Sequence, residues 1–390
     1  MGDVDVEPVP MHRREVLLAQ ARRMLAHHEA GTTDMAEAEY LAPVSTFTDQ
    51  AAFERELDVV FRRSPVLVGL SCELAEPGAH SAFDVAGSPV VVTRGEDGRV
   101  RAMLNVCRHR GAAVASGRGC ARRLACPYHA WVYDTEGTLV GMPGQEGFSG
   151  VDRSTHGLVQ LPCEERHGLV WLVADPEGTL DLDAWLGPLD AELAELRLGE
   201  LHHVETRKLP ARANWHLAMD TNTESYHFGA LHRDSIGPFT MGNLNVVDTF
   251  GDSQRLTFAA CTLPELAASD EADWRPEQHV QLVYLLFPNN SLLVTGDHVE
   301  LFRIMPGRQV DEQLTHQSYY ARTPVEGPEA QLMAQAQFDM FHAVVRDEDF
   351  PCAESIQRGL ASGANAHLTF GRNEPALHHL HRAQQRLLQE

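Results

Sequence analysis

The sequence predicts an α+β protein: an all-β domain lies in the N-terminal half, and a domain with an antiparallel sheet flanked by helices follows it. Three observations support this. The 390 residues suffice for two or three domains at ~100–200 residues each. Short β-like runs separated by turn signals occupy residues 43–175. Helical and strand-like runs then share residues 176–390, and residues 1–42 form a separate N-terminal helical segment.

The first half is expected to begin with two helices and to continue as β-structure. Apolar residues at helical intervals predict helices over Arg13–Ala26 and Phe47–Arg63. After Pro65 the pattern changes, because β-like runs alternate with turn sequences such as Asp97-Gly98. The predicted strands are Val66–Cys72, Pro89–Arg94, Arg99–Val106, Trp131–Tyr133 and Leu169–Val173.

The second half mixes both kinds of element. Helices are predicted over Asp181–Leu198, over Ala213–Leu231 and from about Pro328 to Arg346. Between them, a series of strand-like runs followed by a terminal helix suggests an antiparallel sheet. These runs are Val246–Cys261, Val280–Phe287, Ser291–Thr295, Val299–Met305 and Gln313–Arg322.

Composition excludes several classes of function. The 32 Lys and Arg residues against 55 Asp and Glu residues give a net charge of −23, which argues against nucleic-acid binding because phosphate contacts need clustered basic side chains. No apolar run approaches the ~18 residues of a membrane span. Met1–Pro10 lacks the features of a signal peptide, so we expect a cytoplasmic protein. Seven cysteines, an odd and sparse set, do not suggest a disulfide scaffold.

A first group of metal-binding residue types has the pattern C-x-H-x16-C-x-x-H. It consists of Cys107 and His109, followed by Cys126 and His129. Two Cys and two His residues can bind one zinc ion, or a 2Fe–2S cluster with Cys₂ on one iron and His₂ on the other. The first pair follows a predicted strand and the second precedes one, so two strand-end loops can close over one cluster. This placement favours the cluster over zinc.

A second group lies between residues 214 and 232, where His227 and His232 are five residues apart. On a regular helix that spacing separates two side chains by about 140°, so one regular helix would not aim both at one metal. Gly229 lies between them and allows the helix to unwind. Glu224, three residues before His227, shares its face. The alternative is an amphipathic helix whose imidazoles are solvated or packed.

A third ligand is expected near the end of the last predicted helix. Its inward stripe places Glu348 and Asp349 on the two borders and Asp347 roughly opposite. A carboxylate that points into a core is costly unless it is paired or bound to metal. Helical phase alone does not separate Glu348 from Asp349, and an acidic helix end in solvent is the other interpretation.

On these motifs the chain resembles the large (alpha) subunit of the Rieske non-haem iron oxygenases, the aromatic-ring-hydroxylating dioxygenase family. That family has C-x-H-R-G and C-P-Y-H-G-W around its cluster, and this chain departs only by Ala130 in place of glycine. The family's D-x4-E-x2-Q pattern is matched by Asp349, Glu354 and Gln357. The resemblance extends from about Thr46 to Gly363. It implies a Rieske 2Fe–2S cluster on the first group of residues.

The resemblance also implies a mononuclear Fe(II) held by His227, His232 and Asp349. Such an oxygenase component would use O₂ to hydroxylate or oxidatively demethylate a small aromatic or alicyclic substrate. Electrons would come from a separate NAD(P)H-dependent flavin or iron–sulfur reductase, or through a ferredoxin. In the family's head-to-tail homotrimer, Glu224 would bridge His227 and His129 of the partner subunit.

The sequence leaves open both the identity of the substrate and the class of protein. Glutamate at the position of Glu224 is associated with a subgroup that oxidises quaternary ammonium compounds such as carnitine or betaines, for which Trp274, Tyr284 and Phe302 are candidate cage residues. An apolar pocket near Phe228, Leu231 and Ile236 would suit an aromatic substrate. Alternatives of another class are a Rieske-type electron carrier without oxygenase activity and a zinc-bound structural protein.

Overall fold

The computed structural model describes residues 11–389, which form two compact units. Of the described residues, the larger unit contains 11–55, Leu186–Leu196 and 201–389. The smaller unit contains Glu56–Trp185 and Arg197–Glu200. Within the described residues, the N-terminal segment up to Arg55 is therefore part of the larger unit.

The smaller unit consists mainly of β-structure, as predicted, and it also includes the π-helical segment Leu57–Arg62. A five-stranded sheet has the order β10-β5-β4-β3-β6, and two three-stranded sheets have the orders β11-β12-β2 and β7-β8-β9, with every pair antiparallel. The strands are β2 (Val66–Leu70), β3 (Ala79–Val85), β4 (Ser88–Arg94), β5 (Val100–Leu104), β6 (Arg118–Cys120), β7 (Arg123–Ala125), β8 (Val132–Asp134), β9 (Leu139–Gly141), β10 (Gln160–Leu161), β11 (Cys163–Arg166) and β12 (Leu169–Leu172).

The larger unit is built on a seven-stranded antiparallel sheet with the order β13-β19-β18-β17-β16-β15-β14. The strands are β13 (His202–Ala211), β14 (Thr240–Phe250), β15 (Ser253–Ala260), β16 (Val280–Leu286), β17 (Asn290–Val294), β18 (His298–Pro306) and β19 (Gln313–Ala321). The prediction of one strand over Val246–Cys261 is wrong. Gly251, with φ of +61°, reverses the chain there, because glycine adopts this conformation without steric cost, and the run forms the β14–β15 hairpin.

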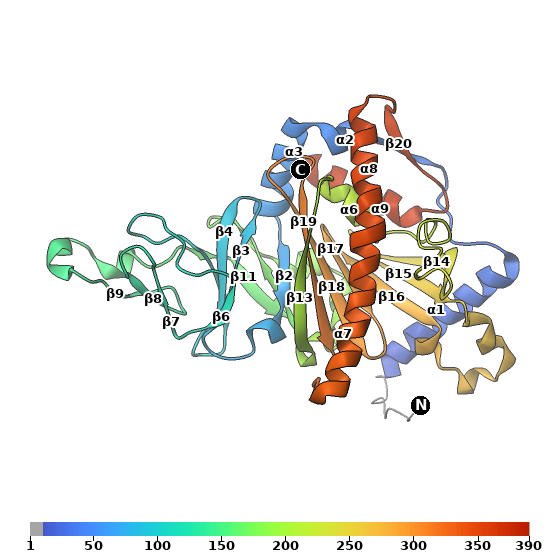
Figure 1. The fold of residues 1–390 in the computed structure, drawn as a ribbon, viewed down its shortest axis with the longest axis horizontal. Helices are drawn as coiled ribbons and strands as arrows, with labels where there is room; N and C mark the ends of the chain where they lie inside the picture. Colours follow the sequence, from blue (N-terminus) through green and yellow to red (C-terminus); the bar gives the residue numbers. More distant parts are fainter. Residues whose placement is uncertain (1–10, 390) are drawn as a thin grey trace. The chain divides into compact units, whose positions relative to one another are not determined.

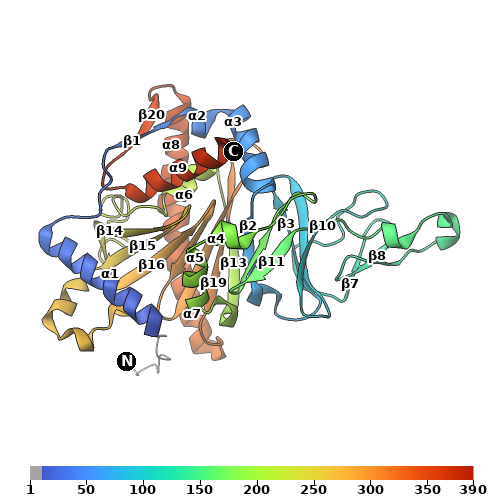
Figure 2. The same ribbon diagram turned by 180° about the vertical axis from the view of Figure 1, so that it is seen from behind.

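Helices cover both faces of this sheet. The long helix α7 (Gly327–Val344) and α8 (Phe350–Ala361) cross the near face in Figure 1. From behind, α1 (Met11–Ala30) and α9 (Pro375–Gln389) lie over the other face (Figure 2). The same unit contains β1 (Tyr40–Pro43), which pairs with β20 (His367–Phe370). The other α-helices of this unit are α2 (Ser45–Thr48), α3 (Gln50–Glu56), α5 (Leu189–Glu195) and α6 (Trp215–Asp220), whereas α4 (Leu182–Leu186) lies almost entirely in the smaller unit.

Two departures from regular helices matter for the site. Of the predicted helix Ala213–Leu231, only α6 forms, and the chain from Thr221 to Phe239 runs in turns. Between α7 and α8, residues Val345–Asp349 form a π-helical segment, a feature often found at functional sites. Within residues 11–389 we find no helix with both the length and the apolar character that crossing a membrane requires.

Candidate metal centres

Three side chains from distant parts of the larger unit converge on one point. His227 Nε2 and His232 Nε2 lie 3.1 Å apart. Asp349 Oδ1 lies 3.1 Å from His232 Nε2 and 3.6 Å from His227 Nε2. Among the described residues, this is the one group of three or more His, Cys, Asp and Glu side chains whose ligand atoms gather closely enough to hold a metal ion.

The irregular backbone after α6 explains how histidines five residues apart face the same point. The N–H of Leu231 donates to the carbonyl of His227, and the N–H of His232 donates to that of Phe228, so the segment makes a single distorted helical turn. The two imidazole rings meet edge to face, with their centroids 4.8 Å apart and their planes at 70° to each other. A regular helix would have pointed them in different directions.

The π-helical segment resolves the choice between the acidic residues at the end of α7. A π turn has more residues than an α turn, so it shifts the angular position of every residue after it. Asp349 is 5% exposed and faces the histidines. Glu348 instead contacts the far side of His232, and Asp347 is exposed and pairs with Arg346.

A carboxylate holds each imidazole from behind. Glu224 Oε1 accepts a hydrogen bond from His227 Nδ1, and Glu348 Oε2 accepts one of 2.7 Å from His232 Nδ1. Ser235 donates a further bond of 2.9 Å to Glu348. A proton on each Nδ1 leaves the lone pair of each Nε2 directed at the common point, which is the usual arrangement behind metal-bound histidines.

Glu354 and Gln357, which follow Asp349 in the sequence pattern, connect α8 by hydrogen bonds to the segment just before α6. Glu354 Oε1 accepts a 2.9 Å hydrogen bond from the N–H of Arg212, and Gln357 Oε1 accepts one of 2.9 Å from the N–H of Asn214. Asn214 then caps α6 by accepting a bond from the N–H of His216. Residues of α8 therefore fix the start of the segment that carries both histidines.

The geometry and electrostatics of this group fit a divalent metal ion. Ligand atoms bound at ~2.1 Å and right angles to one another lie ~3.0 Å apart, close to the observed separations. Asp349 Oδ1 is buried and has no hydrogen-bond partner among the described residues. Burial lowers the pKa of His232, but the carboxylates of Asp349 and Glu348 outweigh it and raise that pKa overall, so the site attracts positive charge.

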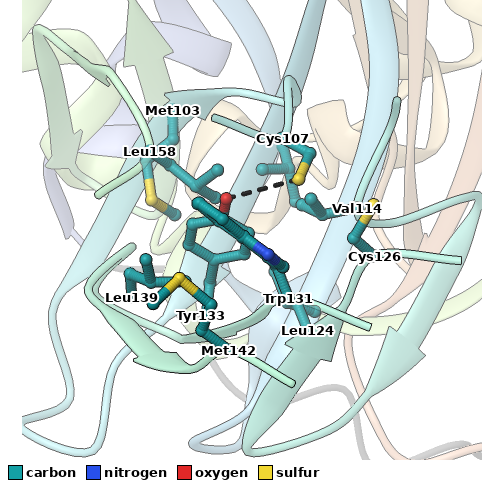
Figure 3. Packing of buried hydrophobic residues seen from close by; sticks show 11 residues of the cluster. Met103, Cys107, Val114, Leu124, Cys126, Trp131, Tyr133, Leu139, Met142 and Leu158 are labelled. Carbon is teal, nitrogen blue, oxygen red and sulfur yellow. Dashed lines mark hydrogen bonds between the residues drawn. The ribbon is translucent and has the colours of Figure 1, made fainter. Parts of the chain in front are cut away.

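In the smaller unit, Cys107 and His109 lie in the loop between β5 and β6, and Cys126 and His129 lie in the loop between β7 and β8. Cys107 and Cys126 are buried free thiols at the edge of a hydrophobic core (Figure 3). The rings of His109 and His129 lie 4.6 Å apart. His129 Nδ1 is buried and has no hydrogen-bond partner among residues 11–389. Two thiols, two imidazoles and an unpartnered ring nitrogen are the donor set that a Rieske cluster needs.

Aromatic residues pack around this donor set. Trp131 stacks on His109 with centroids 5.0 Å apart at 9°. The buried Tyr133 accepts a 2.9 Å hydrogen bond from the N–H of Arg108, so its own proton is free to point at Cys107 Sγ, 3.4 Å from the hydroxyl oxygen (Figure 3). Burial and the thiol of Cys107 raise the pKa of Tyr133, which keeps the hydroxyl protonated. The sequence motif gave no indication of this contact.

Ala130, where the family motif has glycine, takes a left-handed backbone conformation with φ of +53°. Its N–H donates to the carbonyl of Cys126, and the N–H of Cys126 donates to the carbonyl of Trp131. This tight turn presents His129, and it imposes on alanine a conformation that favours glycine. Replacing glycine by alanine is therefore a strained change and not merely one small residue for another.

A cavity of about 350 Å³ begins at the His227, His232 and Asp349 group and runs between the sheet and α7. Phe228 and Ile236 line it as expected, whereas Leu231 lines a second cavity that also borders Glu224, His227 and Asp349. Of the three aromatic cage candidates, Phe302 lines the first cavity, and Trp274 and Tyr284 do not. Five phenylalanines make its wall largely apolar: Phe228, Phe239, Phe258, Phe302 and Phe341.

Comparisons with known proteins agree with this geometry. Residues 64–161 match the Rieske [2Fe-2S] domain, and residues 198–390 match the catalytic domain of the ring hydroxylating alpha subunit. The carnitine monooxygenase oxygenase subunit of Escherichia coli is 30% identical over 337 residues, which cover 82% of this chain and 84% of that protein. The chain belongs to the Rieske non-haem iron oxygenases. It is an oxygenase subunit with a Rieske 2Fe–2S cluster and a mononuclear iron.

The chain is also similar to a second relative and to a solved structure. The glycine betaine monooxygenase oxygenase subunit of Chromohalobacter salexigens is 28% identical over 74% of this chain, and the match spans 64% of that relative, under two thirds of its length. A solved quaternary ammonium Rieske monooxygenase has the same fold, with a TM-score of 0.77 and 24% identity over 91% of this chain and 96% of that one. Oxygenase components of this kind require a separate reductase, O₂ and a substrate.

Proposed function

We propose that this oxygenase hydroxylates or oxidatively demethylates a small organic substrate at an iron held by His227, His232 and Asp349. The observation that carries the proposal is the convergence of two Nε2 atoms and one Oδ1 within 3.1–3.6 Å at the end of an apolar cavity. Three protein ligands on one side of a metal leave open positions on the other.

In this proposal the two metal groups have separate tasks. When bound, the Rieske cluster at Cys107, His109, Cys126 and His129 supplies electrons, and the mononuclear iron supplies the O₂ chemistry. The chain's own residues bind and orient. Glu224 and Glu348 hold the two iron-side imidazoles in one tautomer, and the phenylalanine wall excludes water and packs against the substrate.

For electron delivery we propose a homotrimer arranged head to tail, with a separate NAD(P)H-dependent flavin or iron–sulfur reductase, or a ferredoxin, as donor. Glu224 would hydrogen-bond both His227 and His129 of the partner subunit. Its contact with His227 Nδ1 supports half of this bridge. A ring that closes through one repeated, unlike contact fits a three-copy assembly.

A second candidate is oxidation of a quaternary ammonium compound. The names of the carnitine and glycine betaine relatives favour it, as does glutamate at the position of Glu224. Phenylalanine faces can bind such a cation through cation–π contacts.

Metal and acid-labile sulfide analysis of anaerobically purified protein tests the proposed function. The oxygenase requires about three irons and two sulfides per chain. Two irons with two sulfides would indicate an electron carrier, and zinc without sulfide would refute the proposal. Substrate-dependent NADH consumption with a surrogate reductase, compared between aromatic compounds and quaternary amines, then separates the two candidates.

A further inference from the structure

A buried glutamate lies beside the first cavity and takes no part in holding the metal. Glu300 of β18 is 0% exposed. It pairs with Leu293 of β17, which lines the cavity, and Phe302, two residues further along β18, lines it as well. Directly paired residues, and residues two apart on a strand, point to the same face of a sheet. Glu300 therefore lies in the layer between the sheet and α7, next to the cavity wall.

Hydrogen bonds connect Glu300 to α7. The side-chain amide of Gln317 donates a bond of 2.6 Å to Glu300 Oε2, and Gln317 Oε1 accepts one of 2.9 Å from His342 Nδ1 of α7. Both ends of this amide are thus in use, and His342 carries a proton on Nδ1. One side chain therefore joins Glu300 to the helix that supplies Phe341 and Val344 to the cavity wall.

The other oxygen of Glu300 faces an imidazole nitrogen. Glu300 Oε1 lies 3.8 Å from His298 Nε2, and both atoms are buried without a hydrogen-bond partner in the described part of the chain. His298 Nδ1 donates a 2.8 Å bond to the exposed carboxylate of Asp297, so a neutral His298 has a lone pair on Nε2. When Glu300 is a neutral acid, its hydroxyl can point at that lone pair, and neither buried atom faces another acceptor.

The surroundings of Glu300 favour the neutral acid. Burial raises the pKa of Glu300 to about 8, although the bond from Gln317 and the charge of Arg207 act in the opposite direction. Arg207 is itself held by Glu205 and Asp339. An ionised Glu300 would therefore be a buried charge without a counter-ion of its own, which is costly.

The titratable neighbours of Glu300 on β19 and α7 are neutral as well. Tyr319 is its directly paired residue on β19, and burial is the main cause that raises the pKa of Tyr319. Burial is also the main cause that lowers the pKa of His342 on α7. The tyrosine hydroxyl thus keeps its proton, and the imidazole of His342 stays uncharged near neutral pH.

We propose that Glu300 is a positioning residue of this oxygenase, which as a neutral acid closes a polar chain that holds α7 against the sheet and so sets the wall of the first cavity. The members of this polar chain are Asp297, His298, Glu300, Gln317 and His342. The π-helical segment that ends at Asp349 follows α7 directly, so a shift of α7 would also move that ligand. The positioning role rests on the proposed function, whereas the proton on Glu300 can be measured whatever the protein oxidises.

Infrared difference spectroscopy of the intact protein tests the proton on Glu300. At about pH 6, below the raised pKa, we expect the spectrum of wild type minus Glu300→Gln to contain the carbonyl band of a protonated carboxylic acid. At about pH 9.5 the bands of a carboxylate should replace it. A carboxylate band already present at about pH 6 would mean that His298 holds the proton, and the proposal would then be wrong.

Hydrogen–deuterium exchange of the α7 backbone amides tests the positioning role. Glu300→Gln preserves the polar chain, because the new amide accepts from Gln317, donates toward His298 and has no proton to lose in this range. We expect equal protection of α7 in wild type and Glu300→Gln at about pH 6, and at least ~10-fold lower protection in wild type at about pH 9.5. Equal protection at both pH values would overturn the proposal.

Two further variants separate this role from a general effect on the core. Glu300→Leu interrupts the polar chain and should lower the protection of α7 at both pH values, and if that protein does not fold, the comparison of wild type with Glu300→Gln still decides. Tyr319→Phe is the matched control, because it removes a buried hydroxyl that donates to Gln337 of α7 and leaves the polar chain intact. It should keep the pH dependence of wild type. Loss of that dependence in Tyr319→Phe would contradict its assignment to Glu300.

Iron and sulfide, measured on the same samples, separate this inference from the proposed function. A metal content other than about three irons and two sulfides per chain marks failure of the proposed function. With the correct metals bound, wild type should lose its mononuclear iron to a chelator faster than Glu300→Gln at about pH 9.5, and at the same rate at about pH 6. Equal rates at both pH values would show that Asp349 does not depend on Glu300, which contradicts this inference alone.

Discussion

The two proposed metal sites use histidine in opposite ways. In the larger unit, His227 and His232 turn Nδ1 to a glutamate and Nε2 to the metal position. In the smaller unit, His129 keeps Nδ1 buried and without a hydrogen-bond partner, as expected if that atom is the ligand. The iron site thus orients its imidazoles by hydrogen bonds, and the cluster site orients them by ring packing and a tight turn. Carboxylates therefore fix the orientation of the imidazoles at the first site, whereas the backbone turn and the surrounding aromatic rings fix it at the second.

The largest expected effect is loss of the carboxylate ligand itself. Asp349→Ala should abolish mononuclear iron binding and turnover, because the two remaining imidazoles no longer enclose the ion. Iron should fall from about three to about two per chain, with the cluster's visible absorption unchanged. Asp347→Ala, at an exposed residue paired with Arg346, is the matched control. Full iron content in the Asp349→Ala protein would remove this residue from the site.

Next in size is the proposed bridge. Glu224→Gln should keep both metals bound but lower turnover at least ~10-fold, since the amide no longer accepts the Nδ1 proton of His227 as a carboxylate does. Steady-state turnover and metal analysis on the same preparation measure this. Near-normal turnover would show that electron delivery does not pass through Glu224.

Glu348, the carboxylate behind the other imidazole, should affect metal affinity, whereas Glu224 should affect turnover. Glu348→Gln weakens the hold on His232 Nδ1 and should lower the affinity for Fe(II) by ~10-fold or more. Competition with a chelator measures this affinity. Ser235→Ala, which removes only the hydroxyl that donates to Glu348, should have a smaller effect. Equal affinities in wild type and Glu348→Gln would assign Glu348 no role in holding the metal.

A change at the cluster site should alter the reduction potential of the cluster and leave the metal content unchanged. Tyr133→Phe removes the hydroxyl 3.4 Å from Cys107 Sγ. Hydrogen bonds to cluster sulfurs favour the reduced state, so the reduction potential should fall in a spectroscopic redox titration. Tyr128→Phe is the control, because that hydroxyl is bonded to Arg110 and Tyr128 is exposed. An unchanged potential in Tyr133→Phe would contradict the contact.

The smallest effect is expected at the turn that presents His129. Ala130→Gly should raise the free energy of unfolding by about 1 kcal/mol or less, because glycine adopts φ of +53° without the strain that alanine carries, and its greater freedom in the unfolded chain offsets part of the gain. Thermal unfolding of the intact protein measures it. A clear loss of stability would show that the methyl group packs favourably against the turn.

The sequence predicted those elements that depend on residues close together in the chain. The all-β nature of the first domain followed from short runs and turn signals, and most strands of the larger sheet lie where the pattern put them. It failed at Gly251, where one long β-like run hides a hairpin, and along the chain after α6, where helical periodicity continues although the helix does not. Periodicity reports which side chains are apolar, and it does not report where tertiary contacts bend the backbone.

By itself, the sequence determined the two groups of metal-binding residue types, because each pair of ligands is close in the chain and its spacing is visible. The tertiary structure decided what joins residues far apart. It placed Asp349 with the histidines and Glu348 behind His232, since a π-helical segment shifts the helical phase. It also placed Tyr133 at Cys107. Such contacts depend on packing between distant segments, which no local pattern encodes.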